Sequence, residues 1–211
     1  MLEDLVRQSI ELPGGELSLL QPRVAAELPD AGAVEWAPLA PYWAVLWRSG
    51  VALARELDGA PLRGLRVVEL GCGLALPSLV AARGGAVALA TDGCPEALDL
   101  VARNAGANGL SVETARVDWA DAGALAARGT FDLVLAADVL YERRAAGALL
   151  SLLPRLGQEA WLADPGRPAA EPFVEQARRR WRVETVERGV VSVHRLRIGG
   201  CPPMHFGSDA A

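Results

Sequence analysis

The chain has 211 residues, of which 51% are apolar, which is enough for one domain with a large buried core. Its formal net charge of −5 leaves no basic footprint for a nucleic-acid partner, and its three cysteines form neither a metal-ligand pattern nor a disulfide framework. We find no signal peptide and no apolar run of about 18 residues, so the sequence predicts a soluble, cytoplasmic protein without a membrane partner.

The first 40 residues are predicted to form an extension that precedes the main domain. Within it, two short apolar runs between residues 7 and 21 flank Pro13-Gly14-Gly15, a pattern typical of a β-hairpin. A loop rich in proline follows, up to Pro41, which suits the first position of a helix. Apolar residues then recur at helical spacing, so one helix is predicted from Pro41 to the stop at Asp58-Gly59.

After this helix, apolar runs and helical patterns alternate, which is typical of an α/β sheet. The expected strands are 66–70, 86–91, 112–117, 131–137 and 159–163, and the expected helices are 76–83, 95–108, 145–153 and 169–181. Two final strands, 182–187 and 190–198, form an antiparallel hairpin around Gly189. The prediction is a Rossmann-like sheet of seven strands within a domain at 41–198, followed by a flexible tail at 199–211.

The first strand of this sheet runs directly into a glycine turn, Gly71-Cys72-Gly73. Glycine lets a ligand approach the backbone, and ligands bind at the carboxyl ends of such strands. Glu69, two residues before the turn, indicates which ligand. A carboxylate here suits the ammonium and sulfonium of S-adenosyl-L-methionine, directly or through water, and repels the pyrophosphate of a dinucleotide.

Other strand ends complete the expected cofactor pocket. Asp92 ends the second strand and is placed to accept hydrogen bonds from both ribose hydroxyls. After the third strand, Asp118 would accept from the exocyclic amine of adenine, and Trp119 would stack on the base. Ala137, the last residue of the fourth strand, is also assigned to the cofactor. Together with the glycine turn, these residues predict an S-adenosyl-L-methionine site.

The candidate reacting residues are Asp138 and Tyr141, which follow the fourth strand at the same edge, near the methyl group. Neither Asn-Pro-Pro-Tyr nor Asp-Pro-Pro-Tyr occurs here, which argues against methylation of adenine, cytosine or glutamine amino groups. The remaining pattern is Asp138-x-x-Tyr141. With Glu69-Leu70-Gly71-Cys72-Gly73 and Asp118-Trp119, it resembles the seven-β-strand (class I) protein lysine methyltransferases, whose hallmark is Asp/Glu-x-x-Tyr/Phe after strand four.

Two further segments are similar to one branch of that family, which methylates the β-subunit of electron-transfer flavoprotein. They are Pro41-Tyr42-Trp43-Ala44 with Trp47, and Asp164-Pro165-Gly166-Arg167. Gly71-Cys72-Gly73-Leu74-Ala75-Leu76-Pro77 and Thr91-Asp92-Gly93 look closer to other branches.

The resemblance implies a class I methyltransferase sheet and methylation of a lysine on a protein substrate. It also implies that Asp138 borders the amine and the cofactor, that Tyr141 shapes the lysine channel, and that Trp47 packs against the cofactor.

Two alternatives stay open. A small-molecule N-methyltransferase of the nicotinamide type would need a closed pocket with a lid, and the length of segment 22–42 does not decide this. A non-catalytic cofactor-binding protein would keep the same fold. Arg167 is either a solvated loop residue or a contact for an acidic patch on a protein substrate. The run Arg178–Arg182 is interpreted as the exposed end of a helix.

Overall fold

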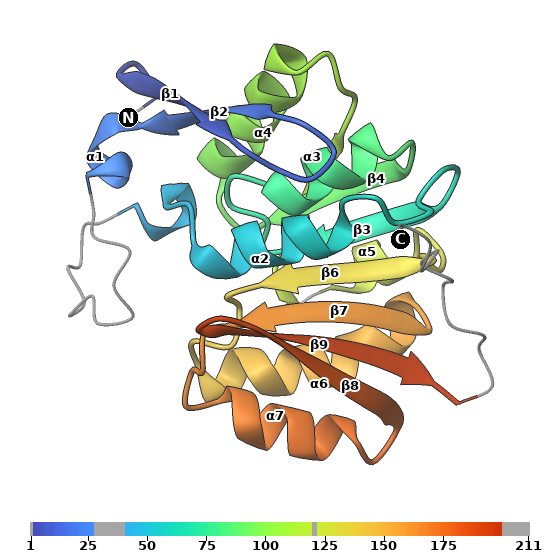
Figure 1. The fold of residues 1–211 in the computed structure, drawn as a ribbon. Coiled ribbons are helices and arrows are strands. Elements are labelled where there is room, and N and C mark those ends of the chain that lie inside the picture. Colours follow the sequence, from blue (N-terminus) through green and yellow to red (C-terminus); the bar gives the residue numbers. More distant parts are fainter. Residues whose placement is uncertain (1, 28–40, 120–121, 200–211) are drawn as a thin grey trace, which may run out of the picture.

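The computed structural model describes residues 2–27, 41–119 and 122–199, and it contains a mixed sheet of seven strands (Figure 1). In spatial order the strands are β5 (Glu113–Arg116), β4 (Val87–Asp92), β3 (Arg66–Leu70), β6 (Leu133–Ala137), β7 (Glu159–Asp164), β9 (Val191–Ile198) and β8 (Trp181–Arg188). The first five are parallel, whereas β9 is antiparallel to both β7 and β8. The predicted Rossmann-like sheet with a C-terminal hairpin is therefore confirmed.

Helices cover both faces of this sheet. One face carries α2 (Arg48–Leu57), α3 (Leu76–Arg83) and α4 (Pro95–Ala107), and the other carries α5 (Gly123–Ala126), α6 (Arg143–Leu156) and α7 (Ala170–Ala177). Successive strand residues point to opposite faces, so Leu133 and Leu135 join the first core while Val134 and Ala136 join the second. Burial on both faces explains why the strands read as continuous apolar runs.

The predicted N-terminal hairpin is also present, formed by β1 (Leu5–Ile10) and β2 (Leu17–Pro22) and followed by the short helix α1 (Arg23–Ala26). It packs on α4. The amide side chains of Asn104 and Asn108 exchange hydrogen bonds of 2.7 to 3.2 Å with the backbone of Leu20 and Ser18. These side-chain amides satisfy the backbone N–H and C=O groups on the outer edge of β2, as a further strand would. Apolar side chains of the hairpin also belong to the core that α2, α3 and α4 cover.

The predicted helix from Pro41 to residue 57 is wrong in its first half. A 3₁₀ turn spans Tyr42–Ala44, an extended stretch follows, and α2 begins only at Arg48. Two carbonyl groups that a helix would need are used by side chains instead. Trp47 Nε1 donates to Tyr42 O at 3.1 Å, and Gln21 Nε2 donates to Ala44 O at 2.9 Å.

The predicted helix 169–181 is also too long, because α7 ends at Ala177. Trp181 is buried and is already the first residue of β8, so the chain must turn between Ala177 and Trp181. Arg178–Arg180 form that exposed turn, and Arg182 is an exposed strand residue. The predicted tail beyond Gly199, and 28–40 of the candidate lid, lie outside the described residues. None of the described helices is long and apolar enough to cross a membrane.

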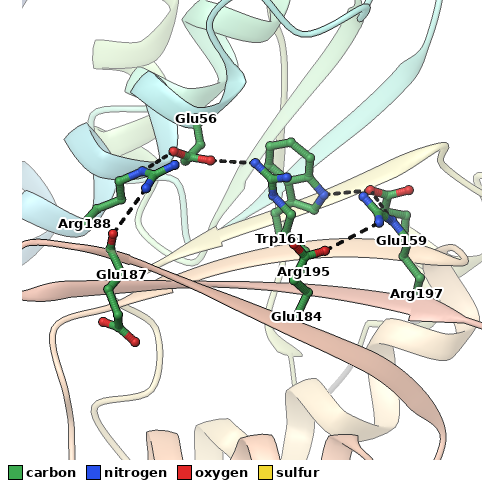
Figure 2. A network of polar contacts seen from close by, with 8 residues as sticks. All are labelled: Glu56, Glu159, Trp161, Glu184, Glu187, Arg188, Arg195 and Arg197. Carbon is green, nitrogen blue, oxygen red and sulfur yellow. Dashed lines mark hydrogen bonds and ion pairs between the residues drawn. The ribbon is translucent and has the colours of Figure 1, made fainter. Parts of the chain in front are cut away.

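A network of charged side chains ties the C-terminal hairpin to α2 (Figure 2). Glu56 of α2 accepts from Arg188 of β8 and, at 2.6 Å, from Arg195 of β9. The Arg195 guanidinium lies 4.3 Å from the ring centroid of Trp161, whose indole N–H donates to Glu159 at 2.7 Å. Arg197 extends the network to Glu159 and Glu184. The network therefore joins the C-terminal end of α2 to β7, β8 and β9.

Candidate functional site

A cavity of about 740 Å³ opens at the carboxyl ends of β3, β4 and β6. The strand order reverses between β3 and β6, the position where ligands bind in open α/β sheets. All ten residues that the sequence analysis assigned to the site line this cavity: Trp47, Glu69, Gly71, Gly73, Asp92, Asp118, Trp119, Ala137, Asp138 and Tyr141. The structure therefore brings the complete predicted set together.

The glycine turn needs glycine for two reasons. Both glycines have positive φ, +64° at Gly71 and +50° at Gly73, which L side chains rarely adopt. A Cβ atom at Gly73 would lie only 2.6 Å from the carbonyl oxygen of Trp43, and one at Gly71 would lie 3.0 Å from the ring of Trp119. The turn is thus enclosed by the 3₁₀ turn on one side and by Trp119 on the other, and a side chain would fill the cradle.

Glu69 lies at the bottom of the cavity and is only 2% exposed. Its Oε2 accepts two hydrogen bonds from Ser78 of α3, one from the backbone N–H at 2.9 Å and one from the hydroxyl at 2.5 Å. Burial raises the pKa of Glu69 to about 8, although the bonds from Ser78 lower it, and nearby Asp92 raises it slightly further. With this pKa, the protonated form of Glu69 predominates at pH 7. No sequence signal pointed to Ser78.

Asp92 is held at the end of β4 by two backbone amides. Its Oδ2 accepts from the N–H of Gly73 at 3.0 Å, and its Oδ1 accepts from the N–H of Cys94 at 2.9 Å. A carboxylate oxygen can accept more than one hydrogen bond, so both oxygens stay able to bind ligand hydroxyls. Asp118 is exposed at the rim, and Trp119 is half-buried against Gly71.

Asp138 follows β6, lines the same cavity and has an unusual backbone. Its φ is +57°, a left-handed conformation that costs energy in residues other than glycine and is often found at functional sites. Its N–H donates to Ala163 O of β7 at 2.9 Å. Its side chain is 5% exposed, and Oδ2 accepts from the Ser49 hydroxyl at 3.3 Å. Sequence reasoning missed Ser49, which lies 89 positions earlier.

Arg167 supplies the remaining bonds to Asp138. Its Nε and Nη2 both donate to Asp138 Oδ1, at 2.8 and 2.7 Å, and its guanidinium carbon lies 5.7 Å from the ring centroid of Trp47. Asp164 directs it there, because Oδ1 of Asp164 accepts from the N–H groups of Gly166 and Arg167, each at 2.7 Å. Arg167 therefore points into the site, unlike either role that the sequence analysis considered. The sequence analysis singled out the segment that contains Arg167 but did not identify Asp138 as its partner.

Tyr141 stands at the mouth of the cavity and is 52% exposed. Partial burial and the neighbouring Glu142 raise the pKa of its phenol. The hydroxyl therefore stays protonated at physiological pH, and this tyrosine offers an aromatic face and a hydrogen-bond donor rather than a base.

Known proteins of similar sequence are lysine methyltransferases. Residues 42–161 match a family model described as lysine methyltransferase. The chain is 35% identical over 120 residues to the protein N-lysine methyltransferase METTL21A of Danio rerio, covering 54% of this chain and 55% of that protein. It is 32% identical over 166 residues to the electron transfer flavoprotein beta subunit lysine methyltransferase of Mus musculus, and this match covers 74% of this chain and 62% of that protein. The chain thus spans less than two thirds of these relatives.

Among solved structures, the T. thermophilus 16S rRNA N2 G1207 methyltransferase RsmC aligns with a TM-score of 0.68. The alignment covers 93% of this chain and 51% of that one at 18% identity, so it supports the fold alone. The fold is that of class I methyltransferases. Because the family model covers more than half of the sequence, the chain belongs to the lysine methyltransferase family.

Proposed function

We propose that this chain is an S-adenosyl-L-methionine-dependent N-methyltransferase that acts on a lysine side chain of a protein substrate. The observation that carries the proposal is that one cavity is lined by the glycine turn with Glu69 and Asp92 and also by Asp138 and Tyr141. Membership of the lysine methyltransferase family supports the choice of lysine as the acceptor.

The residues present fit the proposed cofactor. Asp92, held by two backbone N–H groups, would accept from the two ribose hydroxyls, and Asp118 and Trp119, which line the same cavity, would contact the adenine. The cradle that a Cβ would fill at Gly71 and Gly73 leaves room for the methionine portion. Glu69 would ionise to balance its positive charge, while Trp47 and Ala137 line the wall toward the acceptor. When bound, S-adenosyl-L-methionine supplies an electrophilic methyl group.

The acceptor must arrive as a neutral amine, because an ammonium has no lone pair for the methyl group. Lysine has a pKa of about 10.4, so only about one side chain in 10³ is neutral at pH 7. Neither of the two candidate reacting residues is available as a general base. Asp138 is held by Arg167 and Ser49, and the phenol of Tyr141 is protonated. We infer that the proton leaves to water and that catalysis rests mainly on alignment.

The exposure of Tyr141 favours a protein substrate over a small molecule, because a lysine on a protein surface must enter through an open mouth. The cytoplasmic location and the lack of a nucleic-acid partner stay predictions from the sequence.

The test is a labelling experiment with radioactive methyl-labelled S-adenosyl-L-methionine and a cell lysate, followed by separation by size and acid hydrolysis of the protein fraction. The chain itself contains no lysine, so any labelled methyl-lysine must come from a substrate. We expect methyl-lysine in the protein fraction, and D138N to lower the rate about 100-fold through lost alignment while cofactor still binds. Label confined to the small-molecule fraction would contradict the proposal.

A further inference from the structure

We propose that Arg167 is a positioning residue that neutralises Asp138 and thereby makes the acceptor site select the uncharged form of the lysine amine. The inference rests on the proposed function, because it concerns the substrate of the same site. It assigns to Arg167 a role in the reaction that the family motif, Asp138-x-x-Tyr141, does not contain.

The geometry of the pair carries the proposal. Two guanidinium N–H groups donate to one oxygen of Asp138, the other oxygen accepts from Ser49, and the carboxylate is 5% exposed. Arg167 is anchored at its own backbone by Asp164 and packs on the ring of Trp47. Such a double, largely desolvated ion pair is stronger than a surface pair, so Asp138 enters the reaction with its charge already balanced.

The neutralisation of Asp138 by Arg167 matters because an unpaired carboxylate would favour the wrong protonation state of the lysine. An uncompensated Asp138 would bind the lysine as an ammonium and stabilise that form, which cannot attack the methyl group. With Arg167 in place, the pair carries no net charge, and a second cation beside it gains little. The lysine is then held mainly by the apolar and aromatic walls, as the neutral amine that the reaction needs.

Other ionisable groups line the same cavity or contact the pair. They are Tyr42 before α2, Glu69 in β3, Asp92 at the end of β4, Tyr141 and Glu142 after β6, and Asp164 at the end of β7, which binds the backbone of Arg167. Arg116 and Asp118 line the far rim. Burial raises the pKa of Asp164 to about 6, while the N–H groups of Arg167 and Gly166 lower it and Asp138 raises it. Above pH 7, Asp164 is ionised and holds the turn at Gly166 and Arg167 through its two hydrogen bonds. The kinetic measurements are therefore made above pH 7.

The experiment compares the wild-type chain with R167Q, R167K and R83Q, using the protein acceptor recovered from the labelling experiment. Arg83 provides a matched control. Arg83 pairs with Asp58 at 2.7 Å, and these side chains are 21% and 6% exposed. Arg167 pairs with Asp138 at the same distance, and those side chains are 23% and 5% exposed. Neither Arg83 nor Asp58 is among the residues that line the cavity. The readouts are kcat and KM from pH 7 to 10 at saturating cofactor, and acceptor affinity by calorimetry without cofactor.

In R167Q we expect the acidic limb of the kcat profile to move up by about one pH unit, which lowers kcat near neutral pH about tenfold. KM and the dissociation constant of the acceptor should fall together, because the bare carboxylate now attracts the ammonium. R83Q should keep the wild-type profile even if it lowers the melting temperature. R167K keeps the charge but cannot reproduce both guanidinium bonds, so the acidic limb of its kcat profile should move by less than about half a pH unit.

An unchanged midpoint of the acidic limb in R167Q would overturn the inference. A midpoint in R167K that rises by about half a pH unit or more would overturn it too, and this tests the inference even if R167Q fails to fold. A wild-type chain that labels no lysine would instead refute the proposed function itself. The two failures are therefore distinguishable.

Discussion

Replacing Glu69 by Gln is predicted to abolish the pH dependence of cofactor binding between pH 6 and 7. Burial raises the pKa of Glu69 to about 8, while Ser78 lowers it and Asp92 raises it. At pH 7 about ten molecules are therefore protonated at Glu69 for each one that is ionised. S-adenosyl-L-methionine carries an ammonium and a sulfonium, so it binds better to the ionised form, and binding must release the proton.

The size of the effect follows from this pKa. The ionised fraction of the wild-type chain rises about ninefold from pH 6 to pH 7, so the association constant should rise about ninefold, with about 0.9 proton released per cofactor at pH 7. In E69Q the side chain has nearly the same shape but cannot ionise, so its affinity should be weaker and flat.

The same pKa determines whether the stability of the wild-type chain, relative to E69Q, rises or falls with pH. The folded pKa lies above the ordinary value of 4.5, so the wild-type chain loses stability relative to E69Q as pH rises from about 4.5 through 8.

The assay is titration calorimetry in two buffers with different ionisation enthalpies, which reports affinity and proton release together. Asp164, with a pKa of about 6, titrates in the same window in both proteins, so the difference between wild type and E69Q isolates Glu69. A wild-type affinity that does not change with pH would refute the reasoning, and so would an equal slope in E69Q. Thermal melts over the same range check the predicted sign for stability.

Two further predictions concern the cradle and the fold. We expect G73A to weaken cofactor binding about 10- to 100-fold, because its Cβ would lie 2.6 Å from Trp43 O. G109A, with φ +65° and open space around it, should cost only about 1 kcal/mol of stability, and equal weakening there would contradict the steric explanation. E56Q should lower the unfolding free energy in urea by about 2 kcal/mol, because Arg195 loses its carboxylate, without changing cofactor affinity. A loss of affinity in E56Q would mean that the network also shapes the pocket.

The sheet was predictable because burial on both faces leaves a local mark, a continuous apolar run ended by glycine or an acid. The run at Leu133–Ala137 and the turn at Gly71 to Gly73 are both of this kind. The segment from Pro41 to Trp47 was not predictable in the same way. Its apolar spacing is helical, yet Gln21, from another part of the chain, binds the carbonyl of Ala44 and helps to hold an extended conformation before α2.

The sequence by itself determined which residues meet, because the carboxyl ends of parallel strands share one edge of a sheet, so strand-end residues such as Glu69, Asp92 and Asp138 must converge. Only the tertiary structure decided how Glu69 is protonated and which side chain pairs with Asp138. The protonation of Glu69 depends on its burial beneath α3, and the neutralisation of Asp138 depends on Arg167, 29 positions away. Charge in a cavity depends on desolvation and on neighbours in space, and neither is recorded in the spacing of residues along a chain.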